Sequence, residues 1–513
     1  MVENSAPVFR SLPDRLRSEA ARRPDGPVLI DAGRAASFKD FDVAMDRIAA
    51  TLQSAGVAAG EVIAICASSS IAYLEVFCGA LRAGVTVAPL APSSTAASLA
   101  AMLADCSARI LFLDAGVADH LAPVRDRIAA KWVTLDDTST GMPLRGWVAP
   151  PGAVPQPVEL QPGSPFNIIY SSGTTGTPKG IVQPHVMRTP YETPGLPFGF
   201  GPETVWLVST GLYSNTTLSA VFTALAGGGT LVLMAKFDAR GFLEMAQQHR
   251  VTHAMLVPVQ YQRILAVPEF DRFDLSSFQM KFSTSAPLSA AIKAEVLRRW
   301  PGGLTEYYGM TEGGGGTVLY AHETPDKLHT VGRPWPHVEM RLIDEEGREV
   351  APGEAGEIVG FSTLSMLGYH NRPDATAAAT WHDAAGRAFV RHGDMGRFDD
   401  DGFLILLDRK KDMIISGGFN VFPSDLESVL CEHPDVAEAA VVGAPSESWG
   451  ETPIGFVTSK SGATIDAHEL RAWANQRLGK TQRLSDVRVL PALPRSHIGK
   501  VLKRELRDGY RAQ

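Results

Sequence analysis

The sequence predicts an α/β protein with a large N-terminal part of mixed or parallel sheets covered by helices, a β-rich subdomain, and a small C-terminal α+β domain. Apolar residues recur with helical spacing at 39–56 before the strand-like run 61–67, and such alternation is typical of parallel sheets. After about residue 330 the pattern changes, because apolar and polar residues alternate around Gly and Pro turns. Beyond about residue 412 helical and strand-like runs mix again in a compact block.

The remaining elements follow in chain order. A second helical run covers 71–84, and strand-like runs are found at 86–92, 108–114, 131–136, 230–234 and 253–258. Residues 338–360 predict hairpins, and helices are expected near 423–432 and 467–478. The proline-rich stretch 148–165 predicts an exposed connection.

Composition bounds the size and the class of the protein. At 513 residues the chain exceeds one ordinary hydrophobic core, so two or more domains are expected. Apolar residues make up 45% and charged residues 20%, which is typical of a globular protein. The net charge of −8, without any block of Lys and Arg, argues against a nucleic-acid partner.

Cysteines and the N-terminal residues indicate the compartment. The four cysteines, at 66, 78, 106 and 431, are too scattered for a disulfide framework or a zinc site, so reduced and mostly buried thiols are expected. The N-terminal residues lack the apolar region of a signal peptide, and no apolar run is long enough to span a membrane. We therefore expect a soluble, cytoplasmic protein.

Residues 170–180, YSSGTTGTPKG, carry the strongest chemical signal. Glycines let a backbone turn sharply and direct amide groups at an anion, hydroxyls add donors, and one lysine adds charge. The segment predicts a polyphosphate-binding loop, with a flexible linker as the alternative. It differs from the P-loop of nucleotide hydrolases, because Gly180 and not Ser or Thr follows Lys179. The candidate phosphate ligands are Ser171, Ser172, Gly173, Thr174, Thr175, Gly176, Thr177 and Lys179.

This loop resembles the phosphate-binding signature of the adenylate-forming superfamily, which includes AMP-forming acyl-CoA synthetases, 4-coumarate:CoA ligases, stand-alone adenylation enzymes and beetle luciferases. The resemblance implies an adenylation domain at 1–411 and a mobile C-terminal domain at 412–513. It also implies that a carboxylate reacts with ATP to give acyl-AMP and pyrophosphate before a thiol attacks. ATP, Mg²⁺ and coenzyme A are the implied cofactors and co-substrates.

A second match is TEYYGMTEGGGG at 305–316. The resemblance implies that Tyr308 stacks on adenine, that Thr311 bonds the α-phosphate, and that Glu312 holds Mg²⁺. A hard cation that bridges phosphates favours a carboxylate oxygen, which suits Glu312. The same resemblance places Ser285, Ala286 and Pro287 in the nucleotide site. Taken alone, the tyrosines could equally be ordinary strand residues and the glutamate a solvated acid.

Two further matches concern the ribose and the domain junction. RHGDMG at 391–396 resembles the family's TGD step, which implies that Asp394 accepts the ribose hydroxyls, with His392 where threonine is frequent. DRKK at 408–411 implies that Arg409 helps to hold ribose and that Lys411 is the hinge. Gly418, in the pair Gly417-Gly418, would line the path of the CoA arm, with a plain β-turn as the alternative.

The last match, LPRSHIGKVLKREL at 493–506, implies that Lys500 is the catalytic lysine. A carboxylate must approach a phosphorus surrounded by negative oxygens, and a mobile ammonium group can draw these anions together. The matches follow the family's order from residue 170 to residue 500. A surface lysine in a basic tail would be the alternative for this segment alone.

Three branches of the superfamily compete: a CoA ligase, an enzyme that loads a carrier protein, and a luciferase. Residues 205–222, VWLVSTGLYSNTTLSAVF, contain no acid that could pair with the ammonium group of an amino acid. A catalytically silent nucleotide sensor is the non-enzymatic alternative, which intact Glu312, Asp394 and Lys500 disfavour. The resemblance leaves both a monomer and a homodimer open.

The same segment indicates the acid. It is apolar, contains no arginine, and has Tyr213-Ser214 where many relatives keep an aromatic-His pair. Gly313 and Gly314, in the run 313–316, would remove side chains beside the carboxylate, or form a flexible loop. We expect a monocarboxylic acid with an apolar body, either medium-chain aliphatic or aromatic.

Overall fold

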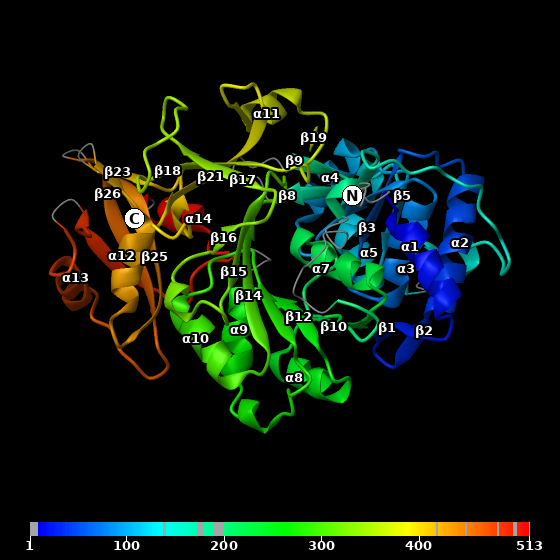
Figure 1. The fold of residues 1–513 in the computed structure, drawn as a ribbon, viewed down its shortest axis with the longest axis horizontal. Helices are drawn as coiled ribbons and strands as arrows, with labels where there is room; N and C mark the ends of the chain where they lie inside the picture. The colour runs from blue at the N-terminus through cyan, green and yellow to red at the C-terminus, as the bar shows by residue number, and fades with distance from the viewer. Residues whose placement is uncertain are drawn as a thin grey trace, which may run out of the picture.

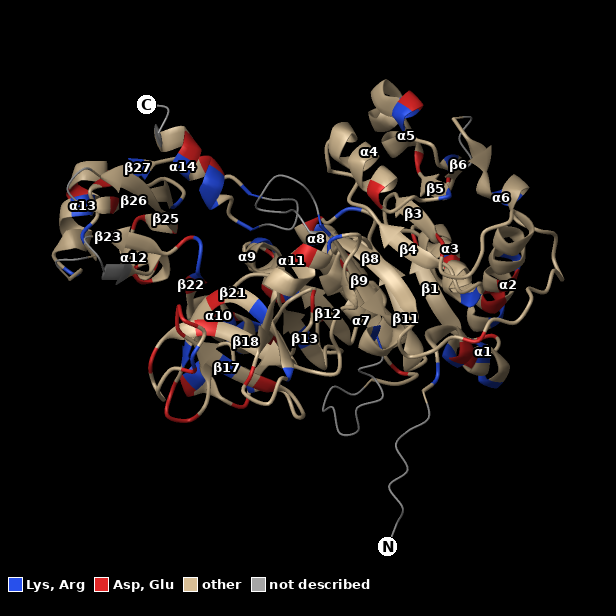
Figure 2. Ribbon diagram, turned by 90° about the horizontal axis from the view of Figure 1, so that it is seen from above, with Lys and Arg blue, Asp and Glu red and all other residues tan. Residues whose placement is uncertain are grey.

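The computed structural model describes residues 9–136, 140–171, 179–188, 200–416, 419–446, 449–479, 482–495 and 500–511. The strands of these residues form four sheets, and helices cover the two largest (Figure 1). The mixed α/β class predicted from the sequence is confirmed. Figure 2 shows that basic and acidic residues are interspersed over the molecule.

The first large sheet has nine strands in the order β16-β15-β14-β13-β12-β10-β11-β1-β2. Its pairs from β14 to β1 run parallel, while β2 at one end and β15 and β16 at the other are antiparallel. Parallel neighbours need crossover connections, and helices provide them here. The strands are β1 (Pro27–Asp31), β2 (Arg34–Ser37), β10 (Val205–Val208), β11 (Thr230–Leu233), β12 (His253–Leu256), β13 (Met280–Ser283), β14 (Gly303–Gly309), β15 (Gly316–Tyr320) and β16 (Arg333–Pro334).

The second large sheet has eight strands in the order β19-β9-β8-β4-β3-β5-β6-β7. Every residue of β3 is buried, as expected for a parallel strand that is covered on both faces. The strands are β3 (Val62–Cys66), β4 (Thr86–Pro89), β5 (Ile110–Leu113), β6 (Lys131–Thr134), β7 (Met142–Pro143), β8 (Pro165–Ser171), β9 (Lys179–Pro184) and β19 (Gly368–Tyr369).

Helices of this part pack on the sheets, and one apolar core joins residues of both sheets with α2, α3 and α7. Helix α2 begins with a capping box, in which the Ser37 hydroxyl accepts from the Asp40 amide at 3.1 Å and the Asp40 carboxylate accepts from the Ser37 amide. The helices are α1 (Leu12–Arg22), α2 (Phe38–Ser54), α3 (Ile71–Arg82), α4 (Ala96–Asp105), α5 (Ala115–Leu121), α6 (Leu144–Trp147), α7 (Asn215–Ala226), α8 (Ala239–Gln248), α9 (Pro258–Leu265) and α10 (Ala290–Arg299). Short 3₁₀ helices are found at Ala122–Arg127, His185–Arg188, Phe270–Arg272 and Pro325–Lys327.

Two smaller sheets follow. The β-rich subdomain contains β17 (Glu339–Ile343), β18 (Gly356–Phe361), α11 (Pro373–Ala378), β20 (Thr380–His382), β21 (Ala388–Phe398) and β22 (Leu404–Arg409). The C-terminal block contains β23 (Ile414–Ser416), β24 (Phe419–Val421), α12 (Pro423–Cys431), β25 (Val436–Ser446), β26 (Gly450–Ser459), α13 (Ala467–Asn475), β27 (Asp486–Val489) and α14 (Lys503–Arg511). This block has apolar clusters of its own and lies at the opposite end of the molecule from α1 and α2 (Figure 1).

Most predicted elements are present. The helical runs 39–56 and 71–84 are α2 and α3, the hairpin segment contains β17 and β18, and the two C-terminal helices are α12 and α13. The stretch 148–164 has no regular element, as expected. Three cysteines are buried and Cys431 is exposed, all as free thiols. No helix in the described ranges is both long and apolar enough to cross a membrane.

Candidate active site

The hairpin of β8 and β9 carries the predicted phosphate loop. Ser171 pairs with Lys179 across this hairpin, so the two ends of the loop are adjacent. The Lys179 ammonium lies 5.2 Å from the centre of the Tyr369 ring on β19. The other predicted loop residues, Ser172, Gly173, Thr174, Thr175, Gly176 and Thr177, lie outside the described residues, as does Gly418.

Asp394 lies at the centre of a cluster of side chains from β14, β21 and β22. It faces Arg409 across the β21–β22 pair, and Arg409 Nε lies 2.7 Å from Asp394 Oδ1. The Tyr308 hydroxyl, from β14, donates to Asp394 Oδ2 at 2.8 Å. His392 Nδ1 lies 3.0 Å from the same hydroxyl. The structure therefore brings together the three residues for which sequence analysis predicts roles at adenine and ribose.

Glu312 lies nearby with its side chain largely buried. Its Oε1 accepts a hydrogen bond from the Tyr369 hydroxyl at 2.8 Å, and burial together with this carboxylate raises the pKa of Tyr369. The carbonyl oxygen of Thr311 accepts from Gln183 Nε2 at 2.6 Å. Sequence analysis missed Tyr369 and Gln183, because neither stands in a phosphate-like or acidic motif.

Lys500 comes from the C-terminal block and reaches this cluster. Burial is the largest cause that lowers its pKa, and the neighbouring cation Arg409 lowers it further. The carboxylates of Asp394 and Glu312 act in the opposite direction, so both lie close enough to interact with the Lys500 ammonium. The predicted lysine therefore lies within electrostatic range of the predicted ribose and metal carboxylates.

The predicted hinge residue Lys411 is exposed, two residues after β22. Its pKa is also lowered, first by partial shielding of the side chain from water and then by the charges of Arg409 and Arg507. Arg409 ends β22 of the β-rich subdomain, and Arg507 belongs to α14 of the C-terminal block. Charged side chains from both of these regions therefore act on Lys411.

Ser285 connects the Ser285–Pro287 segment with the expected acyl site. Its backbone has φ of 77°, an unusual value for a residue with a side chain, and its Oγ lies 2.5 Å from Thr216 Oγ1 in the first turn of α7. Ser214 is the N-cap residue of α7, and the preceding Tyr213 is mostly buried, which raises the pKa of its hydroxyl. The segments predicted to bind the nucleotide and the acyl group thus meet at the start of α7.

Stacked aromatic rings run along the first sheet beside this point. The rings of Trp206 and Phe282 are 5.4 Å apart and nearly parallel, and Tyr307 stacks on Phe282 at 5.6 Å. These rings belong to β10, β13 and β14 and form part of the core shared by the two large sheets. Tyr307, the residue before Tyr308, is therefore part of a row of stacked aromatic rings in the apolar core.

The glycines after Glu312 have a definite structural reason. Gly313 and Gly314 have φ of 80° and 77°. A Cβ on Gly314 would lie 2.5 Å from Val390 Cβ, and one on Gly313 would overlap the carbonyl oxygen of Leu364. The Gly314 amide also donates to Ser365 Oγ at 3.1 Å. The positive φ values and the close contact with other segments of the same chain require glycine at both positions.

Arg188 is a buried cation that sequence analysis missed. Its guanidinium donates to Asn167 Oδ1 at 3.2 Å, and to Asn215 Oδ1 at 2.8 Å and Ser219 Oγ at 3.0 Å on α7. Gln183 Oε1 accepts from it as well. Burial lowers the pKa of Arg188 to about 9. Although residues 205–222 contain no arginine, an arginine from outside the segment contacts it.

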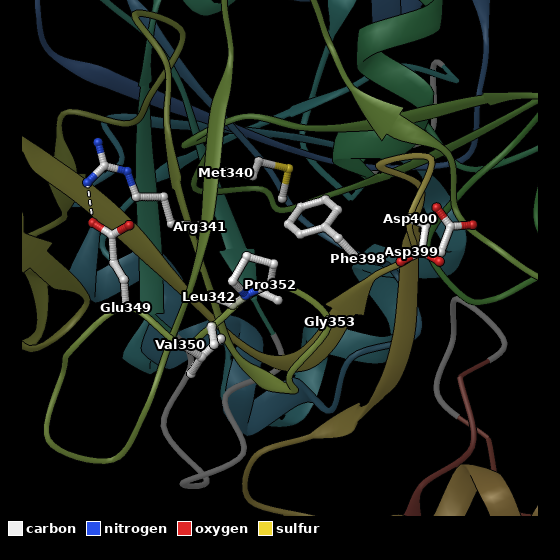
Figure 3. A pocket seen from close by; sticks show the side chains of 11 residues that line it. Met340, Arg341, Leu342, Glu349, Val350, Pro352, Gly353, Phe398, Asp399 and Asp400 are labelled. Carbon is white, nitrogen blue, oxygen red and sulfur yellow. Dashed lines mark hydrogen bonds and ion pairs between the residues drawn. The ribbon is translucent and has the colours of Figure 1, made fainter.

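A surface pocket of about 490 Å³ lies elsewhere, on the β-rich subdomain (Figure 3). Met340, Phe398 and Pro352 supply apolar surface, and Arg341 pairs with Glu349 at 2.5 Å at its edge. None of the residues that line this pocket was predicted to bind nucleotide or acid. The pocket is separate from the cluster around Asp394.

The site fits a magnesium ion that is shared with phosphates. Among the residues that the structure describes, no group of three or more His, Cys, Asp or Glu side chains could hold a metal ion. Mg²⁺ in nucleotide sites typically uses one or two carboxylates together with phosphate oxygens and water. One carboxylate at Glu312, beside the phosphate-loop hairpin, is consistent with this arrangement.

The two-part fold and the order of these motifs are those of the adenylate-forming enzymes. A profile of the AMP-binding enzyme family matches residues 16–370, and a profile of the AMP-binding enzyme C-terminal domain matches residues 425–500. The chain belongs to this family of ATP-dependent enzymes.

Individual relatives refine the class. A fatty acid–acyl-carrier-protein ligase of Streptomyces coeruleorubidus is 30% identical over 98% of this chain and 97% of its own. An indoleacetate–CoA ligase of Aromatoleum aromaticum is 32% identical over 92% of both chains. The crystal structure of ATP-bound MatB from Rhodopseudomonas palustris is 28% identical, covers 98% of each chain and has a TM-score of 0.87. The protein is an enzyme of the acid–thiol ligase class, as predicted.

Proposed function

We propose that the protein is an AMP-forming acyl-CoA synthetase. It activates an apolar monocarboxylic acid, medium-chain aliphatic or aromatic, with ATP to an acyl-adenylate. It then transfers the acyl group to the thiol of coenzyme A. The contacts of Asp394 with Tyr308 and Arg409, near enough to Lys500 for the carboxylate and guanidinium charges to act on it, are the observation that carries this proposal.

The first half-reaction needs charge neutralisation more than proton transfer. A carboxylate oxygen of the acid attacks the α-phosphorus, and the bond to the bridging oxygen breaks as pyrophosphate leaves. The Lys500 ammonium can contact both anions and offset charge that develops in the transition state. Asp394 and Glu312 favour the charged form of this lysine, against the effect of burial.

Other residues bind and orient the nucleotide. Tyr308 would stack on adenine, and Asp394 with Arg409 would hold the ribose, since these side chains already contact one another. Glu312 would hold Mg²⁺, which when bound neutralises phosphate charge. The Tyr369 hydroxyl fixes one oxygen of Glu312. Because this hydrogen bond holds Oε1 in place, the orientation of the whole Glu312 carboxylate, including its second oxygen, is fixed as well.

The acyl site supports a monocarboxylic acid. Tyr213 and Ser214 directly precede α7, and the segment 205–222 carries no charge. Arg188, which contacts this segment, donates to oxygens of the protein itself. A second carboxylate on the substrate would have to displace those oxygens from a buried guanidinium.

The second half-reaction places a different demand on the C-terminal block. The CoA thiol loses its proton to solvent, the thiolate sulfur attacks the acyl carbon, and AMP leaves with the electrons of the broken carbon–oxygen bond. The sequence assigns Lys500 to adenylate formation and Gly418, in the same block, to the path of the thiol, so the block would serve two different steps. We therefore propose that the block from residue 412 rotates about Lys411 between the half-reactions.

Two alternatives to coenzyme A transfer are separable by experiment. The relatives include a ligase that loads a carrier protein, so a carrier protein is the alternative acceptor. A silent nucleotide sensor is the other, although the grouping of Glu312, Asp394 and Lys500 disfavours it.

A panel of aliphatic and aromatic carboxylic acids with ATP, Mg²⁺ and CoA tests the proposal. AMP and pyrophosphate should appear in equal amounts, only with an accepted acid, and acyl-CoA should be found by mass spectrometry. ADP in place of AMP, or no acid-dependent turnover, would contradict it. Adenylate without acyl-CoA, in a reaction completed by an acyl-carrier protein, would favour the alternative acceptor.

A further inference from the structure

Three side chains form a hydrogen-bonded row behind the predicted ribose site. His392 Nδ1 lies 3.0 Å from the Tyr308 hydroxyl oxygen, and this hydroxyl donates to Asp394 Oδ2 at 2.8 Å. His392 is 1% exposed and tilted at 36° to the Tyr308 ring, with ring centres 5.6 Å apart. It stands where the resembling sequences often have threonine.

The chemistry of the row fixes the direction of each hydrogen bond. A tyrosine hydroxyl has one proton, and here that proton points to the Asp394 carboxylate. The contact with His392 must therefore be donated by the imidazole, from a protonated Nδ1 to the Tyr308 oxygen. A neutral imidazole with its proton on Nδ1 has a bare Nε2.

The remaining nitrogen of His392 supports this assignment. Nε2 is buried and has no hydrogen-bond partner among the described residues, which is an unfavourable situation for a polar atom. Burial, and next the cation Arg409, lower the pKa of His392 to about 4, so the ring is neutral at physiological pH. A purely apolar side chain would avoid the unsatisfied nitrogen, whereas the histidine keeps the donor at Nδ1.

We propose that His392 is a positioning residue for nucleotide binding, which orients Tyr308 and Asp394 through this row. The inference rests on the proposed role of Asp394 at ribose. In this proposal His392 acts on nucleotide binding only through its hydrogen bond to Tyr308.

The hydrogen bonds of this row leave the Asp394 carboxylate able to accept two further hydrogen bonds, from the two hydroxyls of ribose. Arg409 occupies one lone pair of Asp394 Oδ1 and Tyr308 occupies one of Oδ2. Each carboxylate oxygen has two lone pairs, so each keeps one for a ribose hydroxyl. If the His392 donor is lost, the Tyr308 oxygen loses the hydrogen bond that holds it in place, and its own hydrogen bond to the carboxylate becomes weaker.

Equilibrium binding of ATP and of 2′-deoxy-ATP, measured by calorimetry without acid or CoA, tests the proposal. His392→Phe keeps a ring but removes the donor, and should weaken ATP binding about tenfold. Binding of 2′-deoxy-ATP should weaken less, because it makes fewer contacts with Asp394. His392→Asn places an amide donor near the position of Nδ1 and should restore most of the preference for ATP.

A double-mutant cycle identifies the route. In a Tyr308→Phe background, His392→Phe should cause no further loss of ATP affinity, because the acceptor of its hydrogen bond is gone. Equal weakening of both nucleotides, or the same loss in either background with melting temperatures unchanged, would overturn the proposal. A wild-type protein with equal affinity for both nucleotides would overturn the ribose role and this inference together. Preference for ATP without turnover of any acid would contradict only the proposed function.

Discussion

Lys503 and Asp408 connect the C-terminal helix to the end of the β-rich subdomain, with Lys503 Nζ 3.3 Å from Asp408 Oδ2. The same carboxylate oxygen accepts from the Ser424 amide at the start of α12, at 3.0 Å. Lys503 also lies 2.9 Å from Glu427 Oε1 on α12. Lys500 is three residues before Lys503, so these contacts anchor the segment that carries Lys500 to the β-rich subdomain.

The first prediction concerns Asp408→Asn, which removes the charge and keeps the pair of Lys503 with Glu427. The side chain of Asp408 is 8% exposed, so its ion pair is worth more than a surface pair, about 1–1.5 kcal/mol. Adenylate formation should slow roughly five- to tenfold, and acyl transfer from preformed adenylate should change little. Single-turnover measurements of pyrophosphate and acyl-CoA separate the two steps.

Arg504→Ala is the matched control, because Arg504 lies on the same helix but is 69% exposed and pairs only along that helix. It should leave both half-reactions unchanged. An Asp408→Asn variant that slowed both half-reactions equally would show that the pair does not favour one orientation.

The second prediction separates backbone strain from close contact at the glycine run. Gly314→Ala places a Cβ against Val390 at a φ of 77°, whereas Gly402, also at 77°, has open space around it. Positive φ costs alanine roughly 1–2 kcal/mol, and overpacking adds about 1–3 kcal/mol. Thermal melts should show the larger loss for Gly314→Ala, and adenylate formation should fall only in that variant. Equal losses in the two variants would indicate that strain alone requires glycine at 314.

The sequence predicted the fold well where its signal is local. Apolar periodicity located α2, α3 and the buried strands, because one face of each helix and both faces of the central strands must be buried. The two-sheet arrangement follows less directly. The pairing of β1 with β11, for example, joins strands that are far apart along the chain, and periodicity carries no information about such partners.

The residues of the candidate site also divide into those that a local motif predicts and those that depend on long-range contacts. Motifs carried Tyr308, Asp394, Arg409 and Lys500, and the structure brings these together. Arg188, Tyr369 and Gln183 carry no motif, since each acts through contacts that exist only in the folded chain. The glycines at 313 and 314 were recognised, but their reason lies in Val390 and Leu364, on segments that pattern alone cannot place beside them.

The third prediction follows from His185, which is buried against the ring of Phe166. Burial lowers its pKa from 6.5 to about 4. Above pH 6.5 both the folded and unfolded states are neutral here, but between 6.5 and 4 only the unfolded state takes up the proton. The free energy of unfolding should therefore fall as the pH falls through this window, by about 1.4 kcal/mol per pH unit.

His185→Leu removes the imidazole that takes up this proton in the unfolded state. Urea titrations between pH 7 and pH 4 should show a shallower loss of stability in the variant than in the wild type. His468→Leu changes an exposed histidine on α13 and should leave the slope unchanged. A His185→Leu slope equal to that of the wild type would mean that this ring is protonated in the folded state.

The fourth prediction is that Lys500→Ala loses adenylate formation while the fold is retained. A preorganised electrostatic contact of this kind is worth on the order of 3–4 kcal/mol, so acid-dependent pyrophosphate release should fall about 10²- to 10³-fold. Affinity for ATP alone should change much less, because Asp394 and Arg409 remain. The same pyrophosphate rate in the variant and the wild type would refute the catalytic role of Lys500.

The last prediction concerns Lys411→Pro at the proposed hinge. Asp412 and Met413 both donate their amides to the carbonyl of Arg409, whereas the Lys411 amide donates to no acceptor among the described residues. Proline therefore removes no recorded hydrogen bond here, but it fixes φ and restricts Lys410 before it. In the orientation that the structure shows, the charges of Asp394 and Glu312 already act on Lys500, so adenylate formation should be spared or slowed mildly.

Acyl transfer to CoA should fall severely in the same variant, because the proposed rotation needs new backbone angles at this residue. Lys411→Ala is the control, since it removes the ammonium group and leaves the backbone free. Single-turnover assays of both half-reactions on folded protein decide the matter. If Lys411→Pro and Lys411→Ala behave alike, the side chain and not the backbone matters at this position. If proline reduces both half-reactions by the same factor, the hinge lies elsewhere in the junction.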